Sequence, residues 1–87
     1  MTYEVRFTRS ARRALAEHLP EKVATAAFTF IMGDLRENPR RVGKQLVEPL
    51  YPLYSARRGE YRVIYRILDE VLVIEIVTVA HRRDAYR

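Results

Sequence analysis

The first stretch of the chain alternates between apolar and polar residues. Within residues 2–8, Tyr3, Val5 and Phe7 fall on one face and polar residues on the other. Period-2 alternation of this kind predicts a half-buried strand. We expect this strand to lie next to the middle of a sheet.

After this strand, the apolar residues recur at the spacing of helices. Thr8 or Ser10 can cap a first helix, which Pro20 ends, and its apolar positions are Ala11, Ala14, Leu15 and Leu19. A second helix is expected from about Pro20 to Asn38. Its buried stripe, at the 3.6-residue spacing of a core-facing helix, is Val23, Ala27, Phe30, Ile31 and Leu35. We interpret its group of large side chains as core residues: Phe28, Phe30 and Met32.

From Leu53 onward the pattern predicts strand, turn, strand, turn and strand, with turns at Arg58-Gly59 and Asp69-Glu70. Residues 61–68 alternate strictly, so Tyr61, Val63 and Tyr65 share one face, and Arg62, Ile64 and Arg66 share the other. Residues 71–79 are rich in β-branched side chains and almost continuously apolar. We therefore expect an interior strand with one face covered by the helices.

The region between the second helix and these strands, residues 40–52, is the least regular. Proline and glycine punctuate it, Arg40, Arg41 and Lys44 make it basic, and residues 45–48 could form a short strand. The order β-α-α-(β)-β-β-β predicts an α+β fold. Two N-terminal helices pack on one face of a mostly antiparallel four- to five-stranded sheet, and residues 1–87 form one domain.

Composition narrows the functional classes. The chain has no cysteine, which excludes disulfides and cysteine metal sites, and His18 and His81 are too few for a histidine-built metal centre. We therefore predict neither metal nor cofactor. No apolar run approaches the roughly 20 residues that span a bilayer, and the first residues lack a signal-peptide layout, so a cytoplasmic protein is expected. The net charge of +5 favours polyanionic partners, nucleic acid first.

Arginine in the alternating strand is the unusual feature. Arg62 and Arg66 share the face of Ile64, and the Arg57-Arg58 pair precedes the turn. A guanidinium on a half-buried surface is costly unless an anion meets it. The two interpretations are solvated edge arginines and an anion-binding strand.

The expected meander brings together, on the sheet face that the helices leave bare, Arg57, Arg58, Arg62, His81 and Arg82, with Tyr86 folded across the same opening. Guanidiniums, an imidazole and a phenol without a carboxylate pair suit cleavage of RNA by its own 2′-hydroxyl. Arginine can hold the phosphate, histidine can carry a proton, and tyrosine can stack on a base. The plainer alternatives are a hydrogen-bonded strand-end histidine, a tyrosine that covers the sheet edge, and a solvated basic tail that contains Arg82 and Arg83.

Several motifs in order along nearly the whole chain resemble the RelE toxins of bacterial type II toxin–antitoxin systems, within the broader RelE/ParE superfamily. They are Phe7-Thr8-x-x-Ala11, Asn38-Pro39, Gly43-Lys44, Ser55-Ala56-Arg57-Arg58-Gly59-x-Tyr61-Arg62-Val63-Ile64-Tyr65 and His81-Arg82-Arg83-x-x-Tyr86. The resemblance implies a ribosome-dependent endonuclease that cuts mRNA in the 30S A site. It also implies a cognate antitoxin, RelB-like or Phd/YefM-like, whose complex with the toxin represses the operon, so that operator DNA is met only through that complex.

By position, the resemblance implies that Arg62 contacts the scissile phosphate, that Arg82 is a second phosphate-binding arginine, and that Tyr86 stacks or assists. His81 stands where some relatives place a catalytic histidine. The further RNA-binding candidates are Lys44, Arg57, Arg58, Arg66 and Arg83.

The chain departs from well-studied RelE members at Leu53 and Ser55, where they carry two lysines. Lys44, Arg57 or His81 could supply the missing assistance to the 2′-hydroxyl. Two other functions stay open: a ParE-like poison of DNA gyrase that hydrolyses nothing, and an idle member retained for operon control.

Overall fold

The computed structural model describes residues 2–82 of the chain. In chain order the elements are β1 (Glu4–Phe7), α1 (Arg9–Arg13), a π-helical turn (Ala14–His18), α2 (Glu21–Phe30), a second π-helical turn (Ile31–Leu35), α3 (Pro39–Val42), β2 (Lys44–Gln45), β3 (Tyr54–Arg58), β4 (Tyr61–Leu68), a 3₁₀ turn (Asp69–Val71) and β5 (Val73–His81).

The strands form one five-stranded sheet in the order β1-β5-β4-β3-β2. β1 pairs with β5 in parallel, and the other three pairs are antiparallel. The predicted α+β fold with a mostly antiparallel sheet is therefore confirmed, and so is the interior position of the last strand. The expected place of the first strand was wrong, because β1 lies at the sheet edge. Its alternate residues Glu4 and Arg6 remain exposed, as an edge strand allows.

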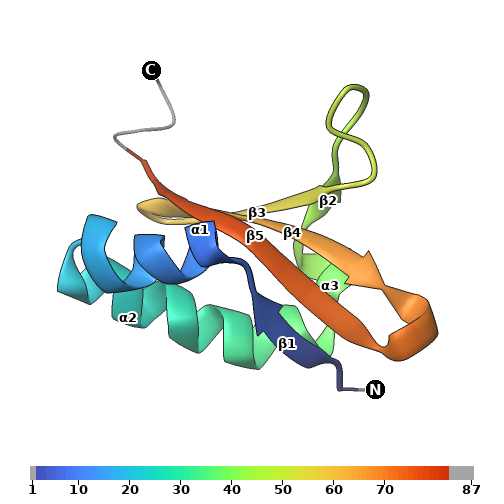
Figure 1. Ribbon diagram of the computed structural model, residues 1–87, viewed down its shortest axis with the longest axis horizontal. Helices are drawn as coiled ribbons and strands as arrows, with labels where there is room; N and C mark the ends of the chain where they lie inside the picture. The colour runs from blue at the N-terminus through green and yellow to red at the C-terminus, as the bar shows by residue number, and fades with distance from the viewer. Residues whose placement is uncertain (1, 83–87) are drawn as a thin grey trace.

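Helices cover one face of this sheet, as Figure 1 shows for α1 and α2. The hydroxyl oxygen of Thr8 accepts a hydrogen bond from the amide of Ala11 at 3.1 Å and so caps α1. After Pro20 the second helix continues to residue 37. All five residues of its predicted stripe are buried, which confirms the helical periodicity.

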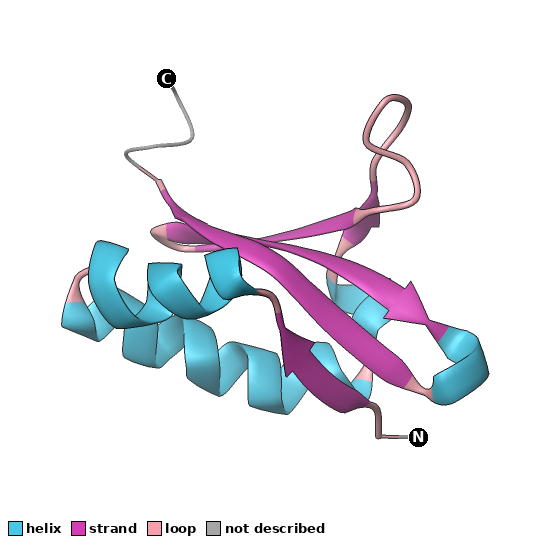
Figure 2. Ribbon diagram, in the orientation of Figure 1, coloured by secondary structure: helices cyan, strands magenta, loops and turns pink. Residues whose placement is uncertain are grey.

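The core lies between these helices and the inward face of β3, β4 and β5. Tyr61, Val63 and Tyr65 of β4 are buried there, together with Ala56 of β3 and Ile76 of β5, and Ile67, the next residue of the alternation, packs partly buried against them. Figure 2 shows α1 and α2 together on one side of the long strands β3, β4 and β5. Within residues 2–82, no helix covers the opposite face of β3 and β4, and we call it the bare face.

Phe28 corrects the prediction for the second helix. Its side chain is 48% exposed instead of buried, and its ring stacks on Phe7 with the ring centroids 6.1 Å apart. It therefore lies on the helical surface, whereas Phe30 belongs to the core and Met32 packs against it.

The irregular region contains more structure than its sequence indicates. α3 forms one short turn, and β2 spans Lys44–Gln45 instead of residues 45–48. Beyond β2, residues 46–53 form a loop that extends away from α1 and α2 (Figure 1), and it carries exposed apolar side chains at Val47, Leu50 and Tyr51.

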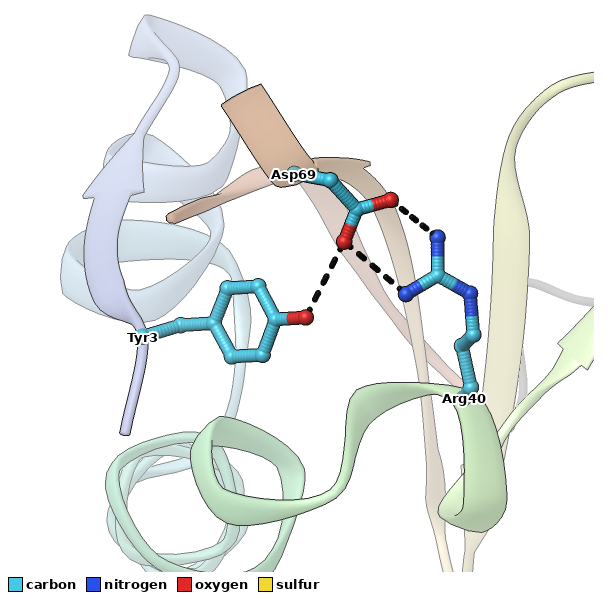
Figure 3. Close-up of polar contacts among 3 residues, drawn as sticks. All are labelled: Tyr3, Arg40 and Asp69. Carbon is cyan, nitrogen blue, oxygen red and sulfur yellow. Dashed lines mark hydrogen bonds and ion pairs between the residues drawn. The ribbon is translucent and has the colours of Figure 1, made fainter. Parts of the chain in front are cut away.

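An ion pair ties α3 to the turn between β4 and β5, as Figure 3 shows. Arg40 donates two hydrogen bonds to the carboxylate of Asp69, and the hydroxyl of Tyr3 donates a third at 3.1 Å. The hydrogen bonds from Arg40 are the main cause of a pKa of Asp69 below its ordinary value. Three separate segments therefore meet at one carboxylate.

A lowered pKa of Asp69 means that this contact stabilises the fold above the pKa of the unfolded chain and loses its effect as the pH falls through the folded value. We therefore expect Asp69→Asn to lower the midpoint of thermal unfolding at pH 7, and the difference from wild type to shrink as the pH falls below the ordinary pKa of an aspartate. The same charge change at the neighbouring residue, Glu70→Gln, serves as the control. A difference between wild type and Asp69→Asn that persists unchanged at pH 3 would contradict the electrostatic explanation.

Candidate functional site

The register of the sheet gathers three basic residues at one spot on the bare face. Arg57 of β3 stands directly opposite Arg62 of β4. On the other side of β3, Lys44 of β2 stands opposite Ser55. Directly paired residues point to the same face of a sheet, and Ser55 and Arg57 are two residues apart in β3. Lys44, Arg57 and Arg62 therefore surround one spot.

A shallow groove of about 420 Å³ occupies that spot. Its floor comes from Ser55, Arg57 and Arg62, and its wall comes from the end of α3 and the start of β2. The lining residues are Val42, Gly43, Lys44, Leu46, Ser55, Arg57 and Arg62. We call it the basic groove.

The charges of the basic groove favour an anion. None of the described residues that line it is acidic. Two like charges directly opposite each other on neighbouring strands are destabilising, and an anion between Arg57 and Arg62 removes that repulsion. A guanidinium also offers paired donors that match the oxygens of a phosphate. An arrangement of this kind has the charge and the donors needed to hold a phosphate.

Other predicted site residues lie elsewhere. Arg66 shares the bare face but stands opposite Glu75, with 3.8 Å between a guanidinium nitrogen and a carboxylate oxygen. Arg82 follows β5 directly, and its amide donates to the carbonyl of Glu60 in the β3–β4 turn. It therefore lies at the end of the sheet where Arg57 and Arg62 lie. Arg83 and Tyr86 fall outside the described residues.

Arg58 and His81 do not join Arg57 and Arg62, contrary to prediction. Both stand opposite Tyr61, whose side chain is buried beneath the helices. The guanidinium carbon of Arg58 lies 4.8 Å from the centroid of the Phe30 ring, an arrangement that favours a cation–π contact. Because successive strand residues alternate, Arg57 and Arg58 have to occupy opposite faces.

Sequence reasoning identified Lys44 on the wall of the groove but not the uncharged residues beside it. Val42, Gly43 and Leu46 carry no charge that would mark them, and only the pairing of β2 with β3 brings them beside Ser55. The sheet face of Ser55 could have been predicted from the sequence, since Ser55 precedes Arg57 by two residues in the same strand.

Neither a metal cluster nor a membrane-spanning helix is present in the described part. Among residues 2–82, no three side chains of histidine, cysteine, aspartate or glutamate gather as metal ligands would. No helix in that range has the length and apolarity needed to cross a bilayer.

A second surface lies on the helices, opposite the bare face. An open groove of about 600 Å³ runs between the first two helical segments and the end of β1. Its apolar lining includes Phe7, Leu15, Leu19 and Phe28, and Arg12 and Glu21 also line it. We call it the apolar groove.

The opposed arginines make a prediction about stability. We expect Arg62→Gln to leave the free energy of unfolding unchanged or to raise it by up to about 1 kcal/mol at low salt, because it removes repulsion from Arg57. Arg66→Gln is the matched control on the same strand and face. It breaks the pair with Glu75 and should lower stability slightly.

Urea denaturation of both variants at low and high salt measures this difference. A loss of stability in Arg62→Gln larger than that in Arg66→Gln would show that Arg62 is held for folding and not for an anion.

Comparisons with known proteins cover nearly the whole chain. The family described as "ParE toxin of type II toxin-antitoxin system, parDE" matches residues 5–86. Toxin RelG of Mycobacterium tuberculosis is 49% identical over 87 residues, which are 100% of this chain and 99% of that toxin.

Two solved structures extend the similarity to three dimensions. A chain of the toxin–antitoxin complex RelBE2 from Mycobacterium tuberculosis is 48% identical, with a TM-score of 0.90, over 94% of this chain and 100% of that chain. A chain of the archaeal RelE–RelB complex from Pyrococcus horikoshii is 30% identical, with a TM-score of 0.69, over 94% of this chain and 97% of that chain. The residues that the family model matches, 5–86, include those that line the basic groove.

Proposed function

Because the chain belongs to the RelE/ParE superfamily of type II toxin–antitoxin toxins, as its motifs predicted, we propose that it is a ribosome-dependent endoribonuclease. In this proposal it cleaves mRNA in the 30S A site and so inhibits translation in the cytoplasm. The reaction uses neither metal nor cofactor. The observation that supports this proposal best is the basic groove, where Arg57 and Arg62 stand opposite each other beside Lys44.

The proposed reaction needs no external nucleophile. The 2′-oxygen of one nucleotide attacks the adjacent phosphorus, and the bond from phosphorus to the 5′-oxygen of the next nucleotide breaks. The products are a 2′,3′-cyclic phosphate and a 5′-hydroxyl. One proton passes from the 2′-hydroxyl to water and another passes from water to the departing 5′-oxygen, so the protons balance. The protein contributes alignment and stabilisation of the charged phosphorane.

The groove residues divide these tasks. Arg57 and Arg62 hold the scissile phosphate from the floor of the groove. Lys44, on the wall, stabilises the 2′-oxygen as it loses its proton. We prefer Lys44 to His81 for this role because His81 stands on the helix-covered face.

Residues outside the groove have secondary roles in the proposal. Arg82 and Arg66 contact phosphates that flank the scissile one, and Arg83 and Tyr86 keep the roles implied by the resemblance, phosphate binding and stacking. For Arg58 we propose packing on Phe30 instead of RNA binding.

A decisive test is Arg62→Ala in a reconstituted translation reaction with a defined mRNA, with cleavage followed by primer extension. We expect the cleavage rate to fall roughly 10²–10³-fold, the cost of losing one preorganised charge at a transition state, with no loss of folding stability. Arg66→Ala should cost much less, because Arg66 lies farther along the strand and is paired with Glu75. Wild-type cleavage by Arg62→Ala would reject the proposed site.

A second candidate function is a ParE-like poison of DNA gyrase, since the matching family model describes ParE toxins. The two functions leave different products: a nuclease cuts mRNA only in the presence of ribosomes, whereas a gyrase poison leaves cleaved plasmid DNA. An idle member retained for operon control would do neither. The basic groove favours the nuclease, because it provides a phosphate site on the protein itself.

We further propose that a cognate antitoxin, RelB-like or Phd/YefM-like, binds this toxin and that the complex carries the contact with operator DNA. The solved relative at 48% identity is a chain of the toxin–antitoxin complex RelBE2, and the one at 30% identity is a chain of a RelE–RelB complex. The apolar groove fits an amphipathic helix, with Phe7, Leu15 and Phe28 as its floor. The helix beside it carries Arg9, Arg12 and Arg13, which favours an acidic partner.

This placement predicts that Phe28→Asp weakens antitoxin binding by about tenfold or more, because a charge replaces a large apolar contact. Val71→Asp is the control, since Val71 is 62% exposed but lies in the turn between β4 and β5. Calorimetric titration of the purified antitoxin against each variant measures the effect. Equal affinity of Phe28→Asp and wild type would place the antitoxin on another surface.

A further inference from the structure

We propose that Tyr65 is a positioning residue for the basic groove: its buried hydroxyl holds the segment from α3 to β2 and thereby fixes Lys44 at the groove wall. Tyr65 lies on the face of the sheet opposite the groove. The effect of Tyr65 on catalysis rests on the proposed nuclease function, whereas its effect on the position of Lys44 does not.

Tyr65 lies in the middle of β4 with its side chain fully buried. Its ring stacks on Tyr54 of β3, with the ring centroids 5.6 Å apart. Its hydroxyl donates a hydrogen bond to the carbonyl of Pro39, the first residue of α3. Burial raises the pKa of this phenol, so it stays protonated and remains a donor.

The same hydroxyl also contacts the other end of the α3 turn. A Cβ atom added to Gly43 would overlap the Tyr65 hydroxyl oxygen and would lie 2.8 Å from the ring carbon that carries it. Glycine is therefore required here for space. The hydroxyl lies against Pro39 and Gly43 together, so the turn closes over it.

Lys44 follows Gly43 directly and is the first residue of β2. This strand has two residues and pairs only with Ser55 and Tyr54. α3 has four residues, too few for a helix that is stable by itself.

Arg40 ties the start of α3 to Asp69, and the amide of Leu46 donates to the carbonyl of Leu53 at 2.8 Å. Between these two points the contact with Tyr65 constrains Gly43, and with it where Lys44 stands. Gly43 and Lys44 both line the basic groove, so a shift of this segment changes the groove.

Tyr61 provides a matched comparison within the same strand. It lies on the same buried face of β4, and its hydroxyl donates to a backbone carbonyl, that of Ala26 in α2, at 3.3 Å. Both Tyr→Phe changes remove one hydroxyl and one hydrogen bond from the core. Only Tyr65→Phe releases the segment that carries Lys44, so the pair separates positioning from general stability.

The first experiment follows amide NMR shifts in the whole protein. Tyr65→Phe should shift the amides of residues 40–45 and of Ser55, whereas Tyr61→Phe should leave them unchanged and shift those near Ala26 instead. This outcome supports the positioning role whether or not the protein cleaves mRNA. Unchanged shifts at residues 43–45 in Tyr65→Phe would overturn it.

The second experiment measures single-turnover cleavage of ribosome-bound mRNA by wild type, Tyr65→Phe, Lys44→Ala, the double variant and Tyr61→Phe. We expect Tyr65→Phe to lower the rate at saturating ribosomes about tenfold, with little change in half-saturation, since small displacements of catalytic groups reduce turnover. In the Lys44→Ala background the same change should cost nothing further. Tyr61→Phe should cleave like wild type.

Three results would overturn the link to catalysis: wild-type cleavage by Tyr65→Phe, an equal loss in both Lys44 backgrounds, or the same loss in Tyr61→Phe. Absence of cleavage by the wild-type protein would instead reject the proposed function, and the amide shifts alone would then decide the positioning role.

Discussion

The alternation of β4 is the constraint on which the rest of the structure depends. β4 lies at the centre of the sheet, between β5 and β3. Its inward residues Tyr61, Val63 and Tyr65 build the core, and its outward residue Arg62 builds the basic groove. A shift of one residue would exchange the two sets. The burial energy of three large side chains therefore also fixes the face on which the arginine stands.

Two of those core residues are tyrosines, and their hydroxyls make hydrogen bonds that phenylalanine could not make. A buried hydroxyl needs an acceptor, and within this core the acceptors are backbone carbonyls of Ala26 and Pro39. The first joins β4 to α2 and the second joins β4 to α3. Because Tyr65 satisfies its polar group on a short segment that the ion pair of Arg40 with Asp69 holds only at its start, packing beneath the sheet fixes the groove wall above it.

Sequence periodicity was sufficient for the elements with strong repeats. The stripe of the second helix and the alternation of β4 were predicted residue by residue, because burial enforces both periods. The edge position of β1 was not readable, since it depends on which strand pairs with β5. The exposure of Phe28 depends on the open groove between the helices, which periodicity does not show.

The sheet face that His81 occupies could not be predicted from alternation, for a different reason. The β4–β5 register shifts between Ile64 and Tyr65, which leaves Val77 without an opposite residue on β4. Thr8 stabilises this bulge by donating its hydroxyl to the Val77 carbonyl at 2.6 Å. An extra residue reverses the alternation beyond it, so His81 stands opposite Tyr61 instead of sharing the face of Arg62. By contrast, the face of Arg58 followed from its neighbour Arg57 and could have been read from the sequence.

The basic groove and the apolar groove lie on opposite faces of the molecule, and this separation constrains any antitoxin that inhibits by masking. A single helix in the apolar groove leaves Arg57 and Arg62 accessible, because the sheet lies between them. A partner that also covers the basic groove has to follow the surface around an edge of the sheet. An extended segment that becomes ordered on binding can do this, since it gains contact area along its whole length. For an antitoxin that occupies the apolar groove as proposed and also masks the basic groove, the geometry favours a chain that wraps around the toxin over a compact domain.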